Sequence, residues 1–185
     1  MFDKAVTSES ILDYIGSQAV PGEQRWVLSA IQKYGQELIN MLWRILGNEQ
    51  DVCDAYQDTF LQLAHYEGGL KPDNIKAYLF STANNVAITM LRRKIAERNR
   101  IKRTATNIIE DNSPIKELNS KLMQEILRES IAKLPEHLRE VVVLRDLAEM
   151  SYSQISKILK ISKGTARVYR CKAIQLLAVW MSKEE

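Results

Sequence analysis

Six basic side chains fall between Lys157 and Lys172, and no acidic residue interrupts them. Such a run of cations favours contact with a polyanion, because each Lys or Arg can neutralise a phosphate. The surrounding segment, SYSQISKILKISKGTARVYRCKA (151–173), has the pattern of a short helix, a tight turn and a second helix. These are the parts of a helix-turn-helix, whose second helix lies in the major groove of DNA.

Local signals define the ends of these two helices. Ser151 and Gln154 have capping-box spacing, which predicts a helix over 151–159, and Ser162 is predicted to cap the next helix. The inward residues of that second helix are predicted to be Ala166, Tyr169, Ala173, Leu176, Leu177 and Trp180. The residues predicted to face DNA are Lys163, Thr165, Arg167, Val168, Arg170, Cys171 and Lys172.

The sequence leaves open what this second helix contacts. Arg167 and Lys172 could each read a guanine edge or hold a phosphate. The competing interpretation is an ordinary helical hairpin with solvated basic faces. We favour the helix-turn-helix because the cap, the turn and the charge pattern occur together.

Nearly every patterned segment of the chain has helical periodicity. Besides the two C-terminal helices, helices are predicted over about 24–46, 50–66, 74–100, 122–133 and 135–149. The intervening stretch 105–121 is rich in Ser, Thr and Asn and lacks periodicity, as linkers do. The prediction is an all-α fold in which two helical domains, 24–104 and 122–185, follow an N-terminal extension, 1–23, and are joined by a flexible linker, 105–121.

A second basic block ends the first of these domains. Residues 85–103 carry seven Lys and Arg against one Glu, on a chain whose net charge is only +3. Two separate basic blocks suggest two polyanion contacts, although two solvated helix faces would give the same counts. Acidic residues gather instead in the helix predicted over 50–66.

The residues that would support other functions are missing from the sequence. Cys53 and Cys171, taken with His65 and His137, have no disulfide-framework or metal-ligand spacing. There is no phosphate-binding glycine loop, HExxH motif or nucleophile–base pair. We therefore expect no enzyme activity, no metal and no cofactor. No apolar run is long enough for a membrane span and no signal-peptide core is present, so we expect a cytoplasmic protein without membrane insertion.

Both halves of the chain resemble one family. The stretches LPEHLREVVVLRDL, SYSQISKIL and ISKGTAR within residues 134–173 closely resemble sigma domain four of the extracytoplasmic-function (ECF) sigma factors. ILGNEQDVCDAYQDTFLQL (45–63) and IKAYLFSTANNVAITMLRRK (75–94) resemble two segments of their sigma domain two. The resemblance covers roughly residues 24–178, with the two domains in the family's order.

The resemblance implies a transcription initiation factor. Such a factor binds the clamp and flap of core RNA polymerase and directs it to promoters. It would read the −35 element as duplex through the helix-turn-helix and the −10 element as a melted strand through sigma domain two. The family commonly has an inhibitory partner, an anti-sigma protein, which would hold the two domains together.

The family's functional positions can be carried over onto this sequence. The polymerase contacts would be Asp54, Gln57, Asp58 and Phe60. The contacts with melted promoter DNA would be Tyr78, Asn85, Arg92, Arg93 and Lys94. Unpaired bases need a stacking surface or pocket and a cationic track, which aromatic and basic residues can provide. The loop from Tyr66 to Asn74 stands where the family forms a pocket for an unpaired base.

Two stretches depart from the family pattern. Thr89 and Met90 replace a common Asp-His or Asp-Tyr pair, so that pair has no counterpart here. Val168, Tyr169 and Arg170 stand where the family often has Ser-Arg-Leu, so the base preference of the recognition helix is not transferable.

Two other classes of protein compete with the sigma-factor interpretation. A conventional regulator would bind an operator as a dimer through the same helix-turn-helix. The basic block at 85–103 and the acidic helix before it are better explained by single-strand and polymerase contacts. An interaction protein with an inactive helix-turn-helix would show no salt-dependent affinity for DNA, because it would release no counterions. A nucleic-acid enzyme is disfavoured because it would need catalytic groups that the sequence lacks.

Overall fold

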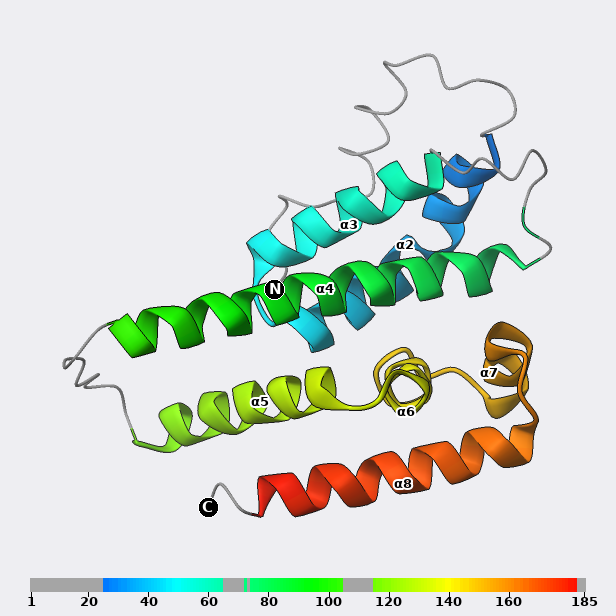
Figure 1. The fold of residues 1–185 in the computed structure, drawn as a ribbon. Helices are drawn as coiled ribbons and strands as arrows, with labels where there is room; N and C mark the ends of the chain where they lie inside the picture. Colours follow the sequence, from blue (N-terminus) through cyan, green and yellow to red (C-terminus); the bar gives the residue numbers. More distant parts are fainter. Residues whose placement is uncertain (1–24, 65–71, 73, 105–114, 183–185) are drawn as a thin grey trace.

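The computed structural model of the chain describes residues 25–64, 72, 74–104 and 115–182, which form only helices. Figure 1 shows an N-terminal unit of three helices lying against a C-terminal unit. The helices of the N-terminal unit are α2 (Arg25–Leu46), α3 (Glu49–Ala64) and α4 (Ile75–Thr104). The C-terminal unit contains α5 (Ile115–Lys133), α6 (Glu136–Val142), the π-helix η3 (Val143–Leu147), α7 (Tyr152–Leu159) and α8 (Lys163–Met181). The all-helical prediction is confirmed for the described residues.

The connection between α2 and α3 depends on a glycine. Gly47 has φ +78°, in the left-handed region that side chains disfavour, and its N–H donates to the Trp43 carbonyl at 2.9 Å. A Cβ on Gly47 would overlap the Arg128 guanidinium, so a larger residue would also displace that side chain. The helix predicted over about 24–46 therefore ends where expected, and Gly47 also makes room for an arginine from the C-terminal unit.

The three N-terminal helices enclose an apolar core. Its fully buried side chains include Ile31, Leu38, Met41, Leu42, Ile45, Tyr56, Leu63, Leu79 and Phe80. Burying a side chain of this size stabilises the fold by about 1.5–3 kcal/mol. Phe60 belongs to the same core, with 3% of its surface exposed and its ring 4.6 Å from that of Tyr56.

The C-terminal unit departs from a run of plain α-helices. The helix that begins after Pro135 changes at Val143 into the π-helix η3, where the Ala148 N–H donates to the Val143 carbonyl five residues earlier. Glu149 then turns the chain with φ 56°. The predicted single helix from 135 to 149 is thus shorter, and its last turn is wider than an α-helical one.

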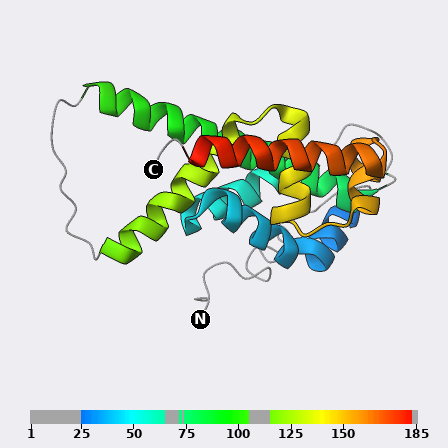
Figure 2. The same cartoon turned by 90° about the horizontal axis from the view of Figure 1, so that it is seen from below.

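The two units dock through α4, which packs against α5 and α7, and through α2, which packs against η3. Both units contribute to one hydrophobic cluster. Helix α5 contacts both α4 and α8, and Figure 1 shows it between them. Figure 2 shows that α4 and α5 diverge towards the segment that joins them. Helix α5 begins at Ile115, so the linker expected over 105–121 ends earlier than predicted. Residues 105–114, the extension 1–23 and most of the loop from Tyr66 to Asn74 lie outside the described residues. In the described chain, no helix is long and apolar enough to cross a membrane.

Candidate nucleic-acid interface

The helix-turn-helix is built by local hydrogen bonds. The Ser151 hydroxyl accepts the Gln154 N–H, and the Gln154 side chain accepts the Ser151 N–H, which completes the predicted capping box. Lys160 makes the turn with φ 53°, and the Ser162 hydroxyl accepts the Thr165 N–H at 2.9 Å to start α8. These caps satisfy amide groups that a helix start leaves unpaired, so the start of α8 is fixed.

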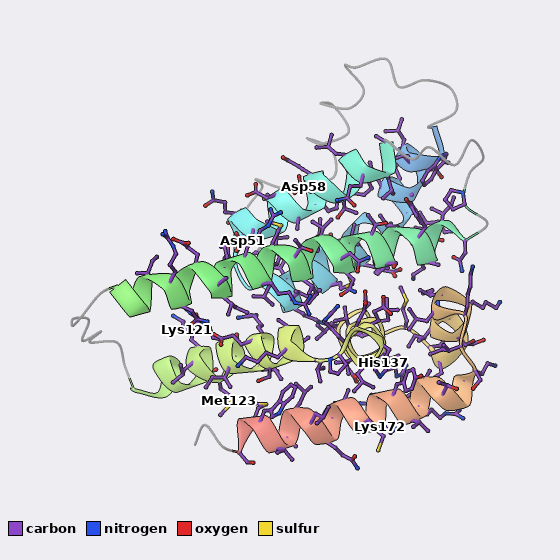
Figure 3. The ribbon with its side chains drawn as sticks, viewed as in Figure 1. Asp51, Asp58, Lys121, Met123, His137 and Lys172 are labelled. Atoms are coloured by element: carbon purple, nitrogen blue, oxygen red, sulfur yellow. The ribbon has the colours of Figure 1, made fainter. Side chains whose placement is uncertain are left out.

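One face of α8 is open. The inward residues Ala166, Ala173 and Leu177 are buried, whereas the predicted inward residues Tyr169, Leu176 and Trp180 are half-buried. The exposed members of the predicted DNA-facing set are Lys163, Arg167, Val168, Cys171 and Lys172. Lys172 lies on the lower side of α8 in Figure 3.

The exposed cations of α8 are available for an anion. Among the described residues, Lys163, Arg167 and Lys172 form no ion pair. The Arg167 guanidinium lies over the Tyr152 ring, 5.4 Å from its centroid, and that of Arg145 lies 5.0 Å from the same centroid. A tyrosine ring attracts cations placed over its face, so Tyr152 supports Arg167 without neutralising it.

Thr165 and Arg170 have a different environment from the other DNA-facing candidates. Thr165 is half-buried beside the Ser162 hydroxyl, to which its own hydroxyl lies at 2.9 Å. The Arg170 guanidinium donates to both carboxylate oxygens of Asp146. This hydrogen bond raises the pKa of Arg170 above its ordinary value.

The basic end of α4 makes contacts within the protein. Arg92 donates twice to the Ala132 carbonyl, at 3.2 and 2.9 Å, and Lys94 pairs with Asp51. Arg98 pairs with Glu125 and Glu129 of α5. Of the predicted melted-strand residues, Asn85 and Arg93 are exposed and Tyr78 is half-buried, while Arg92 and Lys94 are engaged.

The candidate polymerase surface is the outer face of α3. Asp54, Gln57 and Asp58 are exposed there, and Asp58 lies on the upper side of the molecule in Figure 3, opposite the helix that carries Lys172. Phe60 does not belong to this surface, because it is buried in the core. Asp51, another acidic residue of α3, is also buried, with 5% of its surface exposed.

The comparisons with known proteins match both units. The family model described as sigma-70 region 2 matches residues 30–98, and that of sigma-70 region 4 matches residues 124–177. The ECF RNA polymerase sigma factor SigE of Mycolicibacterium smegmatis is 26% identical over 184 residues, which cover 96% of this chain and 68% of that protein. The chain belongs to the ECF sigma factors.

Further comparisons agree with this assignment. The RNA polymerase sigma factor YlaC of Bacillus subtilis is 27% identical over 168 residues, covering 83% of this sigma factor and 92% of YlaC. The solved structure of CnrH in complex with the cytosolic domain of CnrY has the same fold, with a TM-score of 0.54 and 22% identity over 97% of this chain and 100% of the matched chain. Like its family, this sigma factor directs transcription initiation from promoters and is not an enzyme.

The sequence did not reveal the residues that support the recognition helix of this sigma factor. Asp146 pairs with Arg170 across 24 residues, and Arg44 of α2 donates to the Leu147 carbonyl and the Glu149 carboxylate, across 103 and 105 residues. Helical periodicity carries no information about pairs so far apart. The one available signal was an acidic residue, Asp146, close to a helix-turn-helix that is otherwise basic.

Proposed function

We propose that this ECF sigma factor binds core RNA polymerase through the exposed face of α3 and reads the −35 element through α8. The observation that carries the second part is the open face of α8, where Lys163, Arg167 and Lys172 are exposed without carboxylate partners in the described chain. Lys163 and Arg167 lie about 40° apart around the helix axis, and Lys172 lies at the opposite edge of the exposed surface. Such a helix can meet both phosphate walls of a major groove. Such a factor would work in the cytoplasm, where polymerase and promoter meet.

The same proposal assigns the melted −10 strand to α4. Asn85 and Arg93 are exposed on this helix, and Tyr78 lies half-buried nearer its start. Arg92 and Lys94 can join this surface only if they leave the Ala132 carbonyl and Asp51. For Arg92 this requires a rearrangement at the contact between the two units, because Ala132 belongs to α5, whereas Lys94 and Asp51 both lie in the N-terminal unit.

The proposed polymerase contacts are Asp54, Gln57 and Asp58. Their side chains form an acidic and amide surface, which suits a basic partner. Flap binding by the C-terminal unit follows from the family resemblance, and no single described side chain carries it.

We also propose an inhibitory protein partner that bridges the two units. CnrH, which shares this fold, was solved in complex with the cytosolic domain of CnrY. Here a cavity of about 530 Å³ lies between α4 and α5, with Leu91, Ile95 and Ile101 among its apolar lining and Lys94, Glu125 and Arg128 among its charged lining. Full activity of the purified chain, with no inhibitor detectable in its native extract, would contradict this part.

Transcription with sigma-free bacterial core polymerase and a genomic fragment library tests the proposed function. New, specific transcript starts that depend on the chain are the expected result, and their upstream sequences would define both promoter elements. In the same assay Asp58→Arg should prevent co-purification with polymerase, whereas Glu37→Arg, a charge reversal on α2 that also breaks the pair with Lys76, should not. Specific duplex binding without transcription would favour a conventional regulator, and neither result would favour an interaction protein.

A further inference from the structure

Arg170 is held inside the protein by a two-point contact. Its Nε lies 3.0 Å from each carboxylate oxygen of Asp146, and its Nη2 lies 2.7 Å from Oδ1. A fork between a planar guanidinium and a carboxylate fixes orientation as well as distance. The contact therefore ties α8 to the π-helix η3 at a defined rotation.

Arg170 lies at the edge of the exposed face of α8. Successive residues of an α-helix are about 100° apart, so Arg170 lies roughly 60° from Arg167 around the axis and about 100° from the exposed Cys171. The Arg170 side chain is 38% exposed, and its guanidinium contacts Asp146. A guanidinium on that flank, already paired, cannot reach a base edge without breaking its contact.

Residues next to Arg170 and Asp146 make further contacts around the junction of α8 with α6 and η3. The ring of Tyr169 packs edge-on against that of His137 at 4.9 Å, and Arg145 donates to the Met150 carbonyl at 2.7 Å. Asp146 itself lies in η3, so it cannot follow α8 if that helix rotates. The Arg170–Asp146 contact is polar and partly exposed, which limits its contribution to folding stability.

We propose that Arg170 is a positioning residue, whose fork with Asp146 sets the angle at which α8 presents Arg167 and Lys172 to the duplex. This inference rests on the proposed function and changes the role of a side chain that the sequence placed among the DNA contacts. It also identifies Asp146, which faces no DNA, as a determinant of promoter discrimination.

The inference predicts that Asp146 and Arg170 behave as one unit. The variants Asp146→Asn, Arg170→Gln and the double variant would each be combined with core polymerase and offered a duplex pool randomised at the upstream element. Each single variant should lose about tenfold in discrimination at that element, and the double variant should lose no more than either. The salt dependence of binding should stay unchanged, because no phosphate contact is removed.

Three controls separate positioning from other roles. Arg170→Lys keeps the charge but not the fork, so it should resemble Arg170→Gln; wild-type discrimination by this variant would contradict the inference. Base preference at the downstream element should not change in any variant. Melting temperatures should fall by no more than about 2–4 °C, because the pair is partly exposed.

A different result would assign Arg170 to DNA. Wild-type discrimination by Asp146→Asn, with a loss confined to Arg170→Gln, would overturn the inference. A fall of about one in the salt slope of Arg170→Gln would then identify a phosphate contact, and a changed preference at a single position would identify a base contact. If the wild-type holoenzyme selected no upstream sequence, the proposed function would fail before any variant was compared, and the inference would fail with it.

Discussion

The two basic surfaces of this sigma factor differ in what their cations contact. On α8, Lys163, Arg167 and Lys172 are exposed and have no carboxylate partner among the described residues. On α4, Lys94 and Arg98 are paired with carboxylates of the protein itself. Similar densities of positive charge in the sequence therefore correspond to α8, where most cations lack a carboxylate partner among the described residues, and to α4, where most have one.

The difference teaches how the docked units relate to a promoter. Elements centred about 25 base pairs apart are separated by roughly 85 Å of duplex at 3.4 Å per base pair. The longest described helix, α4, has 30 residues and spans about 45 Å. Because the docked units cannot reach both elements together, we expect promoter binding to require their separation, which would free Arg92 and Arg98 from their contacts with α5.

Reversing the charge of Glu129 should have the largest effect, because it weakens the docking of the two units that keeps Arg98 paired. Glu129→Lys replaces the partner of Arg98 with a like charge, which should shift the docking equilibrium by about 2 kcal/mol, since partly exposed pairs contribute up to about 1 kcal/mol each. The radius of gyration from small-angle X-ray scattering should increase above that of the wild type.

Glu97→Lys is the matched control for this change. Glu97 pairs with Arg100 on its own helix, so the same change of charge leaves the contact between the units intact. An unchanged radius of gyration in Glu129→Lys, or an equal increase in both variants, would show that the Arg98 pair does not hold the units together.

Two lysine variants, one on α4 and one on α8, should differ in their effects on stability and on DNA binding. Lys94→Met leaves the buried Asp51 carboxylate without its lysine, which should lower the free energy of unfolding by about 1–2 kcal/mol. Lys172→Met should change stability by less than about 0.5 kcal/mol but reduce the salt slope of DNA binding by about one. Denaturant unfolding and salt titrations measure the two quantities, and equal behaviour of the variants would contradict the comparison.

The smallest expected effect is that of Tyr56→Phe, in the core beneath the α3 surface, on the free energy of unfolding. The Tyr56 hydroxyl is buried without a hydrogen-bond partner among the described residues, and burial raises the pKa of Tyr56 to about 12 from an ordinary value near 10. Tyr56→Phe removes this unpaired group, so it should be neutral or stabilise the fold by up to about 1 kcal/mol near pH 7.

The same pKa gives the sign of a pH dependence. The folded protein keeps the Tyr56 proton in a range where the unfolded chain loses it, so the free energy of unfolding should fall as pH rises from about 10 to about 12. This fall should be smaller in Tyr56→Phe. An identical alkaline fall in both proteins, followed by denaturant unfolding, would exclude Tyr56 as its source.

The parts that the sequence predicted well are set by local signals. The capping box at Ser151, the cap at Ser162 and the glycine at position 47 act within a few residues, and all three are present in the structure. Helical periodicity also predicted the inward side of α8, where Ala166, Ala173 and Leu177 are buried. The family resemblance supplied the order of the domains, which periodicity alone does not determine.

The parts that it missed depend on tertiary contacts. From the sequence, Arg170 is predicted to be a basic residue that faces the DNA groove; the structure places Asp146 beside it. Arg92 reads as a strand contact until the Ala132 carbonyl is placed next to α4. Phe60 reads as a surface aromatic until the Tyr56 ring packs on it. Each difference arises because a residue distant in the sequence, or on the next turn of a helix, takes the interaction expected for a partner molecule.

The π-helix over Val143–Leu147 has a consequence for the phase of everything that follows it. A π-turn accommodates one residue more than an α-turn, so it is equivalent to a single insertion in a regular helix. Deleting that residue would restore the α-helical ladder and rotate the downstream chain by about 100° about the helix axis. The orientation of the helix-turn-helix relative to the N-terminal unit therefore depends on this one extra residue.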